Sequence, residues 1–151
     1  MDTLLTYHDP SGAEFAHRQW PAEVRQLSLV RVAVRDWLGR PNLSGDARAD
    51  MLLAINSAAS NVVKHAYPMA APGNDFGITF WTEHRWVWIE IVDHGEWKIP
   101  ADSSIYPGRG LTIMQRLVDS MLIHHDARGT RVLLGRRLNR RTRDQVGPSR
   151  A

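Results

Sequence analysis

The segment from residue 75 to residue 93 constrains the fold more than any other part of the chain. It contains two runs rich in Ile, Val, Phe and Trp, residues 75–82 and 86–93, joined by a short polar link. This pattern predicts an antiparallel hairpin. The second run, WVWIEIVD, is apolar at nearly every position, so we expect a central strand that is covered on at least one face. The chain therefore needs a second layer to cover its sheet.

Three helix-periodic segments can supply that layer. Apolar residues recur at spacings of three and four within residues 22–38, 47–67 and 111–120. Ser44 or Asp46 can cap the second helix at its N-terminus.

Further strands complete the predicted sheet. Residues 14–20 are typical of a short strand, and residues 121–125 and 130–134 indicate a closing hairpin. Helices that alternate with mainly antiparallel strands predict an α+β fold, a two-layer α/β sandwich with the helices on one face of the sheet.

Composition excludes several classes of protein. A chain of 151 residues can close a single hydrophobic core, and its lack of cysteine excludes disulfides, thiolate metal sites and cysteine nucleophiles. No apolar run approaches the ~20 residues needed to cross a bilayer. The N-terminus lacks the layout of a signal peptide. We therefore expect a cytoplasmic protein without membrane contact.

The net charge of +3 arises at one end of the chain. From residue 136 onward six arginines stand against one acid, Asp144, whereas the rest of the chain carries 13 basic and 15 acidic side chains. We divide the chain into one domain, residues 1–138, and a basic tail, residues 139–151, which we expect to be disordered because it is almost devoid of apolar residues. Direct nucleic-acid binding is not expected, since the basicity belongs to the tail alone.

Three short segments carry polar residues or glycines that suggest a nucleotide site. Asn61 lies in an alanine- and valine-rich helix, and its carbonyl oxygen can complete the oxygen shell of a Mg²⁺ shared with phosphates. Asp93 follows a buried strand, where an unpartnered charge is costly and an adenine amino group would offset that cost. The segment Gly108-Arg109-Gly110-Leu111 precedes a helix, so backbone N–H groups can approach an anion there.

Each of these signals alone has a plain structural alternative. Asn61 could bond within its own helix, and Asp93 could merely end a strand and cap a turn. His124 and His125 resemble a metal pair only superficially, because adjacent strand residues point to opposite faces. The tryptophans are expected to pack against the sheet, although an exposed subset would suit a partner interface.

The order and spacing of the segments resemble those of the anti-sigma-factor serine kinases of bacterial partner switching. These kinases belong to the superfamily of gyrase, histidine-kinase and related chaperone ATPases. The matching stretches are AINSAASNVVKHAYP, VDHGEW, GRGLTIMQRLVD and GTRVLLGRRL. The resemblance implies the histidine-kinase-like ATPase (Bergerat) fold, and the Asp-x-Gly-x-Trp pattern is most similar to the actinobacterial branch.

The resemblance also implies roles for single residues. Asn61 would be the Mg²⁺ ligand, Asp93 would bind the adenine amino group, Gly95 would let the chain turn beneath the base, and Thr130 would lie near the adenine pocket. The phosphates would be framed by Gly108, Arg109, Gly110 and Leu111, under a lid of about residues 96–107, with His65 facing them.

Cofactors and partners follow from the same resemblance. The cofactors would be ATP or ADP with Mg²⁺. The partners would be a sigma factor, an anti-anti-sigma protein of the STAS type, or both, and the chain would form a homodimer.

One position departs from the kinase pattern. The kinases carry a glutamate four residues before the asparagine, where it acts as general base on the substrate serine; here the residue is Ser57. A serine hydroxyl cannot accept that proton at neutral pH. The acid that precedes it, Asp50, lies about 16 Å from Asn61 along a helix at ~1.5 Å per residue. A base from the lid, Glu96 or Asp102, is the remaining alternative, and nothing in the spacing favours it.

Three functions are therefore open from the sequence. The first is an ATP-binding regulator of the anti-sigma type with weak or absent kinase activity. The second is an active serine-protein kinase that phosphorylates an anti-anti-sigma factor by another route. The third is a scaffold that works without a nucleotide.

Overall fold

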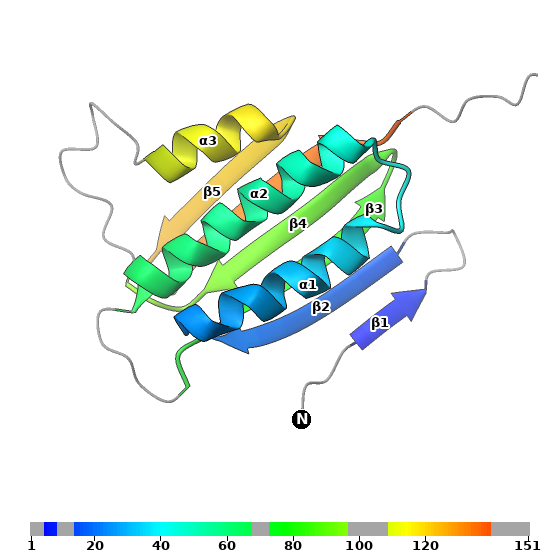
Figure 1. The fold of residues 1–151 in the computed structure, drawn as a ribbon. Helices are drawn as coiled ribbons and strands as arrows, with labels where there is room; N and C mark the ends of the chain where they lie inside the picture. Colours follow the sequence, from blue (N-terminus) through cyan, green and yellow to red (C-terminus); the bar gives the residue numbers. More distant parts are fainter. Residues whose placement is uncertain (1–4, 9–13, 68–72, 97–108, 140–151) are drawn as a thin grey trace, which may run out of the picture.

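A computed structural model of the chain describes residues 5–8, 14–67, 73–96 and 109–139. Its strands form a single six-stranded sheet in the order β1-β2-β3-β4-β6-β5, and each neighbouring pair is antiparallel (Figure 1). The predicted α+β sandwich is confirmed, and β4 is central as expected. The strands are β1 (Leu5–His8), β2 (Glu14–Pro21), β3 (Asp75–Glu83), β4 (Trp86–Asp93), β5 (Ser120–Asp126) and β6 (Gly129–Arg137).

The helices cover one face of this sheet, with α2 between α1 and α3 (Figure 1). The Ser44 side chain caps α2 by accepting a hydrogen bond from the Ala47 N–H at 3.0 Å. Arg48 then donates to the Leu38 carbonyl at 3.1 Å, which joins the start of α2 to the end of α1. The helices are η1 (Val24–Gln26, 3₁₀), α1 (Leu27–Leu38), α2 (Gly45–Asn61), η2 (Val62–Ala66, π) and α3 (Arg109–Leu117).

All three expected helices differ from the structure at an end. The first was expected from residue 22, but it begins with the 3₁₀ turn η1 at Val24 and is α-helical only from Leu27. The second helix was expected to continue regularly to residue 67, but it changes after Asn61 to the π-helical turn η2. Such turns are rare and occur frequently at functional sites. The third helix ends at Leu117 rather than at residue 120, because β5 begins at Ser120 and pairs with Gly135 of β6.

The core lies between the helices and the sheet. Alternate residues of β4, Val87, Ile89 and Ile91, are at most 1% exposed and face the helices, while small alanines let α2 approach them closely. Trp20 and Trp37 pack in this core, with ring centroids 6.1 Å apart.

The other face of the sheet also carries tryptophans. Trp81 and Trp86 both stack against Trp88, at centroid distances of 6.5 and 5.0 Å, and the ring of Trp88 lies directly over Gly135. The expectation that the tryptophans pack against the sheet is thus confirmed for the five that the structure describes. Among the described residues no helix is long and apolar enough to cross a membrane.

Candidate functional site

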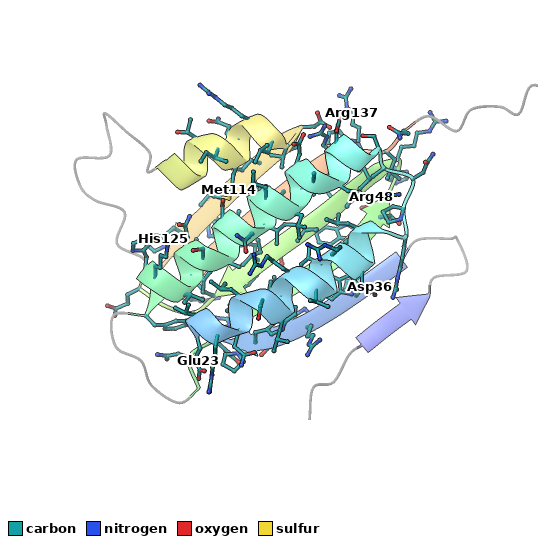
Figure 2. The ribbon with its side chains drawn as sticks, viewed as in Figure 1. Glu23, Asp36, Arg48, Met114, His125 and Arg137 are labelled. Carbon is teal, nitrogen blue, oxygen red and sulfur yellow. The ribbon has the colours of Figure 1, made fainter. Side chains whose placement is uncertain are left out.

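A pocket opens where α2 ends and where β4 reaches its last residue. Three polar residues that are far apart in the sequence, Asn61, Asp93 and Thr130, meet in its wall. Figure 2 shows Met114 of α3 on the side facing α2, and His125 at the end of β5, near the end of α2 where the pocket lies. The pocket is lined by Ala58, Asn61, Val62, Asp93, Met114, Thr130 and Val132.

Asp93 is the buried polar group of this pocket. It is the last residue of β4 and is 4% exposed. Its Oδ1 accepts a hydrogen bond from the Gly95 N–H at 3.0 Å. Burial raises the pKa of the carboxyl group, whereas backbone N–H groups of Gly95 and Thr130 act in the opposite direction. The pocket therefore presents a hydrogen-bond acceptor that the fold keeps away from water.

Two glycines allow the backbone to pack closely around Asp93. A Cβ at Gly95 would lie 2.0 Å from the Ala66 carbonyl oxygen, at the end of η2. A Cβ at Gly129 would lie 1.9 Å from the Asp93 carbonyl oxygen, and its φ of +134° is itself unfavourable for other residues. The turn after Asp93 is thus tightly fitted to its neighbours.

Tyr67 also contacts the turn that follows Asp93. Its hydroxyl group donates a hydrogen bond to the Asp75 carbonyl and accepts one from the His94 N–H at 3.1 Å. Burial raises the pKa of this hydroxyl group, so it stays protonated. Nothing in the sequence pattern singles out Tyr67, because its partners are backbone groups that only the fold brings near.

Thr130 lies between Asp93 and His125. The sheet register places Thr130 directly opposite Asp93 on β4 and directly opposite His125 on β5. Thr130 is 3% exposed, and its Oγ1 is 2.9 Å from the His125 Nδ1. The neighbouring His124 is on the opposite face and approaches Asp126 at 3.3 Å. The two histidines thus face apart, as expected.

Three polar residues of α2 and η2, spaced four residues apart, differ in their surroundings. Asn61 is half-buried and lines the pocket. Ser57 is half-buried one turn earlier, outside the pocket lining. His65 lies in η2, beyond the point where the helix changes its winding, and is exposed. A role for His65 at phosphates therefore stays a prediction.

Asp50, the acid that precedes Ser57, is engaged elsewhere. Its Oδ2 is 3.2 Å from Nη1 of Arg136 in β6. It does not line the pocket. The geometry agrees with the sequence argument that Asp50 does not replace a carboxylate at position 57. Glu96 is exposed, and Asp102 lies outside the described residues.

The predicted phosphate segment is described only in part. Arg109, Gly110 and Leu111 form the first residues of α3, as expected for a helix start, whereas Gly108 and residues 97–107 of the lid lie outside the described residues. The roles of these four residues stay predictions. Among the residues that the structure describes, no three His, Cys, Asp or Glu side chains are grouped so that they could hold a metal ion.

Known proteins with this sequence pattern and fold were found. A family model described as a histidine kinase-like ATPase domain matches residues 20–136. The serine-protein kinase RsbW of Listeria monocytogenes is 27% identical over 138 residues, covering 80% of this chain and 85% of that protein. The serine-protein kinase RsbW of Bacillus thuringiensis is 24% identical over 135 residues, covering 80% of this chain and 82% of that protein.

Solved structures agree with these sequence matches. The structure of the RsbU and RsbW domains of Rv1364c from Mycobacterium tuberculosis has a TM-score of 0.65 and 26% identity. The match covers 83% of this chain but only 33% of the Rv1364c chain. The histidine kinase domain of a blue-light activated histidine kinase from Erythrobacter litoralis has a TM-score of 0.55 at 16% identity. The match covers 76% of this chain and 60% of that one, and it shows a shared fold alone.

Proposed function

Since the chain belongs to the family of histidine kinase-like ATPase domains, we propose that it is an ATP- or ADP-binding regulator of the anti-sigma type with weak or absent kinase activity. The resemblance to the anti-sigma-factor serine kinases is confirmed by the similarity to the RsbW kinases. In this proposal the chain binds a sigma factor, an anti-anti-sigma protein, or both. Residues 1–138 would form the ATPase domain, which is supported by a family match that ends at residue 136.

One observation carries the proposal. The pocket wall holds Asn61 and the buried acceptor Asp93, while the position one turn before Asn61 is occupied by Ser57. A carboxylate buried beside an open pocket fits a ligand that donates hydrogen bonds, such as the adenine amino group. A serine in place of a carboxylate does not fit proton abstraction.

Different residues of the pocket would bind different parts of the nucleotide. Asp93 would accept from the adenine amino group, and Asn61 would supply an oxygen ligand to Mg²⁺. The start of α3, with Gly108 to Leu111, would bind phosphate oxygens through backbone N–H groups. ATP supplies the phosphoryl group that a kinase of this family transfers.

The absence of a carboxylate at position 57 limits the rate of phosphoryl transfer to a partner. A partner's serine hydroxyl next to the phosphates has no carboxylate at position 57 to take its proton. A general base contributes roughly 10²- to 10⁴-fold to such a step. The chain would therefore bind the nucleotide and its partner with little phosphorylation of that partner.

A phosphorylation assay tests this proposal directly. The full chain is incubated with Mg²⁺, labelled ATP and a cognate anti-anti-sigma protein, next to an RsbW kinase with its own partner. We expect phosphorylation at least ~100-fold slower than in the RsbW reaction. An equal rate would show that Ser57 does not disable the kinase and would favour the active-kinase alternative.

A gain-of-function variant sharpens the test. Ser57→Glu restores a carboxylate at the position of the base and is expected to raise the phosphorylation rate. Asn56→Glu is the matched control, because it adds the same charge at a position rotated about 100° around the helix. A rate that responds equally to both variants, or to neither, would contradict the assignment of position 57.

Calorimetric titration of the wild-type chain with ATP and ADP separates the proposal from a nucleotide-free scaffold. We expect saturable binding that requires Mg²⁺ for full affinity. No binding of either nucleotide, by a chain that is folded by circular dichroism, would leave the scaffold as the better description.

A further inference from the structure

A row of three polar side chains runs across the sheet at the pocket. Asp93 of β4, Thr130 of β6 and His125 of β5 are direct cross-strand neighbours on the helix-covered face. Asp93 and Thr130 line the pocket and are 4% and 3% exposed. His125 reaches this row from the outer strand, where its Nδ1 lies 2.9 Å from the Thr130 Oγ1. A surface strand thus contacts a buried hydroxyl group in the pocket wall.

The direction of this hydrogen bond decides what Thr130 offers to a ligand. A threonine hydroxyl group has one hydrogen and can also accept. If the hydroxyl donates to His125, only its lone pairs face the pocket, beside the acceptor Asp93. If His125 donates from Nδ1, the hydroxyl hydrogen is left for the pocket. The protonation of one ring nitrogen therefore sets the hydrogen-bonding pattern of the wall.

The charges around the row favour His125 as the donor. The buried Asp93 carboxylate belongs to the same cross-strand row, on the far side of Thr130 from His125. An N–H bond that points toward a carboxylate is more favourable than a lone pair that points toward it. Among the described residues, the hydrogen-bond partner of Nδ1 is the Thr130 hydroxyl group, and two other titratable residues at this end of the sheet lie or bond elsewhere. His94 is exposed after the end of β4, and Asp126 bonds to the Arg128 N–H and approaches His124.

We propose that His125 is a positioning residue that makes the Thr130 hydroxyl a hydrogen-bond donor into the pocket and thereby sets its preference for adenine. The wall then presents a donor, Thr130, beside an acceptor, Asp93. The adenine edge offers the complementary pair, an amino group next to the ring nitrogen N1. The guanine edge has the reverse order, a carbonyl oxygen next to an N–H, and is rejected. This inference rests on the proposed function, since it assumes that the pocket binds a nucleotide.

The protonation of His125 can be measured without a ligand. Nitrogen-15 NMR of the wild-type chain, at a pH where the ring is neutral, reports which ring nitrogen carries the hydrogen. We expect the hydrogen on Nδ1. A neutral ring with its hydrogen on Nε2 would make Thr130 the donor toward His125 and would overturn the proposal.

A double-mutant cycle tests whether His125 acts through Thr130. ADP affinity is measured by calorimetry for the wild type, His125→Ala, Thr130→Val and the double variant. We expect His125→Ala to weaken ADP binding by about 5- to 10-fold in the wild-type background, the size of one hydrogen bond, and to change nothing further in the Thr130→Val background. The ratio of ADP to GDP affinity should fall in His125→Ala as well. Additive losses, or an unchanged ratio, would overturn the proposal.

Two further variants keep the test decisive. His124→Ala is the matched control, because this adjacent histidine is on the opposite face and bonds to Asp126; its ADP affinity should equal that of the wild type. His125→Phe preserves the bulk of the ring and replaces His125→Ala if the latter does not fold. A wild-type chain that binds no nucleotide would refute the proposed function itself, whereas a wild-type chain that binds ADP with an additive cycle would refute only the role of His125.

Discussion

The carbonyl oxygen of Ala66 occupies the space in which a side chain on Gly95 would have to lie, 2.0 Å from an ideal Cβ. Ala66 ends the π-helical turn that follows Asn61, and Gly95 follows the buried Asp93 by two residues. The contact therefore joins the segment that follows Asn61 to the turn that follows Asp93. It fixes how far the asparagine helix stands from the end of β4.

We predict that Gly95→Ala strongly destabilises the protein and weakens ADP binding. The methyl group would overlap with backbone atoms of Ala66, which cannot move without shifting η2, so we expect a loss of at least ~2 kcal/mol in the free energy of unfolding. Urea denaturation measures this. Gly45→Ala is the matched control: no atom lies within 4 Å of its added methyl group, at the first residue of α2, and its stability should be equal or slightly higher. Equal effects of the two substitutions would contradict the close contact.

Tyr67→Phe should cost both stability and affinity. The substitution leaves the Asp75 carbonyl and the His94 N–H without their shared partner, and a lost hydrogen bond of this kind costs about 1–2 kcal/mol in the free energy of unfolding. Because the His94 N–H belongs to the turn that carries Asp93, ADP affinity should fall as well. Calorimetry and urea denaturation measure the two effects.

Thr79→Val separates these two effects. It breaks the 2.8 Å contact with His17 on the other face of the sheet, away from the pocket. We expect a comparable loss of stability with unchanged ADP affinity. If Tyr67→Phe behaved in the same way, its hydroxyl group would be a structural contact without influence on the pocket.

Asp93→Asn should weaken nucleotide binding while it preserves or raises stability. An amide oxygen can still accept from the Gly95 N–H, but its NH₂ group opposes the adenine amino group, so ADP affinity should fall by more than ~10-fold. Calorimetry checks the affinity. A variant that binds ADP as well as the wild type would contradict the role of Asp93.

The same variant predicts a pH dependence of stability. Burial raises the pKa of Asp93 above the ordinary carboxyl value, so the folded state holds this proton more tightly than the unfolded state does. The wild type therefore loses stability as the pH rises from the ordinary carboxyl pKa through the raised one, and Asp93→Asn lacks this loss. Urea denaturation midpoints at pH values from about 4 to 8 should show that the stability of the variant increases relative to that of the wild type as the pH rises. A constant difference would contradict the raised pKa.

Some features of the fold and the site could be predicted from the sequence, because the local residue pattern and the expected burial indicate the same structure. The run WVWIEIVD can only be a covered central strand, so its terminal Asp93 had to lie at the rim of the core. Ser44 has the side chain and the position of an N-cap, and it is one. Asn61 stands out as a polar residue in an apolar helix, but only its order and spacing relative to Asp93 and the glycine segment suggest a role for it.

The remaining features depend on tertiary contacts and could not be predicted. The turn Val62–Ala66 has no residue that favours π-helix; its shape agrees with the close fit of Ala66 to Gly95 and with the bonds of Tyr67. The alternation of a strand could place His125 on the inner face, but only the register of β5 against β6 brings its Nδ1 to Thr130. Strand β1 pairs at the edge of the sheet and carries too short a pattern to be recognised.

Arg136 should contribute more to stability than any exposed arginine, because it joins three elements. Its side chain lies 3.2 Å from Asp50 of α2 and 3.7 Å from Asp119, and it also donates to the Leu117 carbonyl at the end of α3. Arg136→Met removes this partner from the half-buried Asp50 and from the Leu117 carbonyl, whereas Asp119 keeps the Arg137 N–H at 2.8 Å. We expect a loss of about 1–3 kcal/mol in the free energy of unfolding. Since α3 would be anchored less firmly, ADP affinity should also decrease.

The adjacent arginine provides the control for this last prediction. Arg137 is exposed and lies over the ring of Trp86, at 5.2 Å from its centroid, so Arg137→Met should cost no more than about 1 kcal/mol. Urea denaturation of both variants compares the two losses. Because Arg137 sits on the face opposite to the helices, its substitution should leave ADP affinity unchanged. If the two variants lost the same stability and bound ADP equally well, the network of Arg136 would not anchor α3.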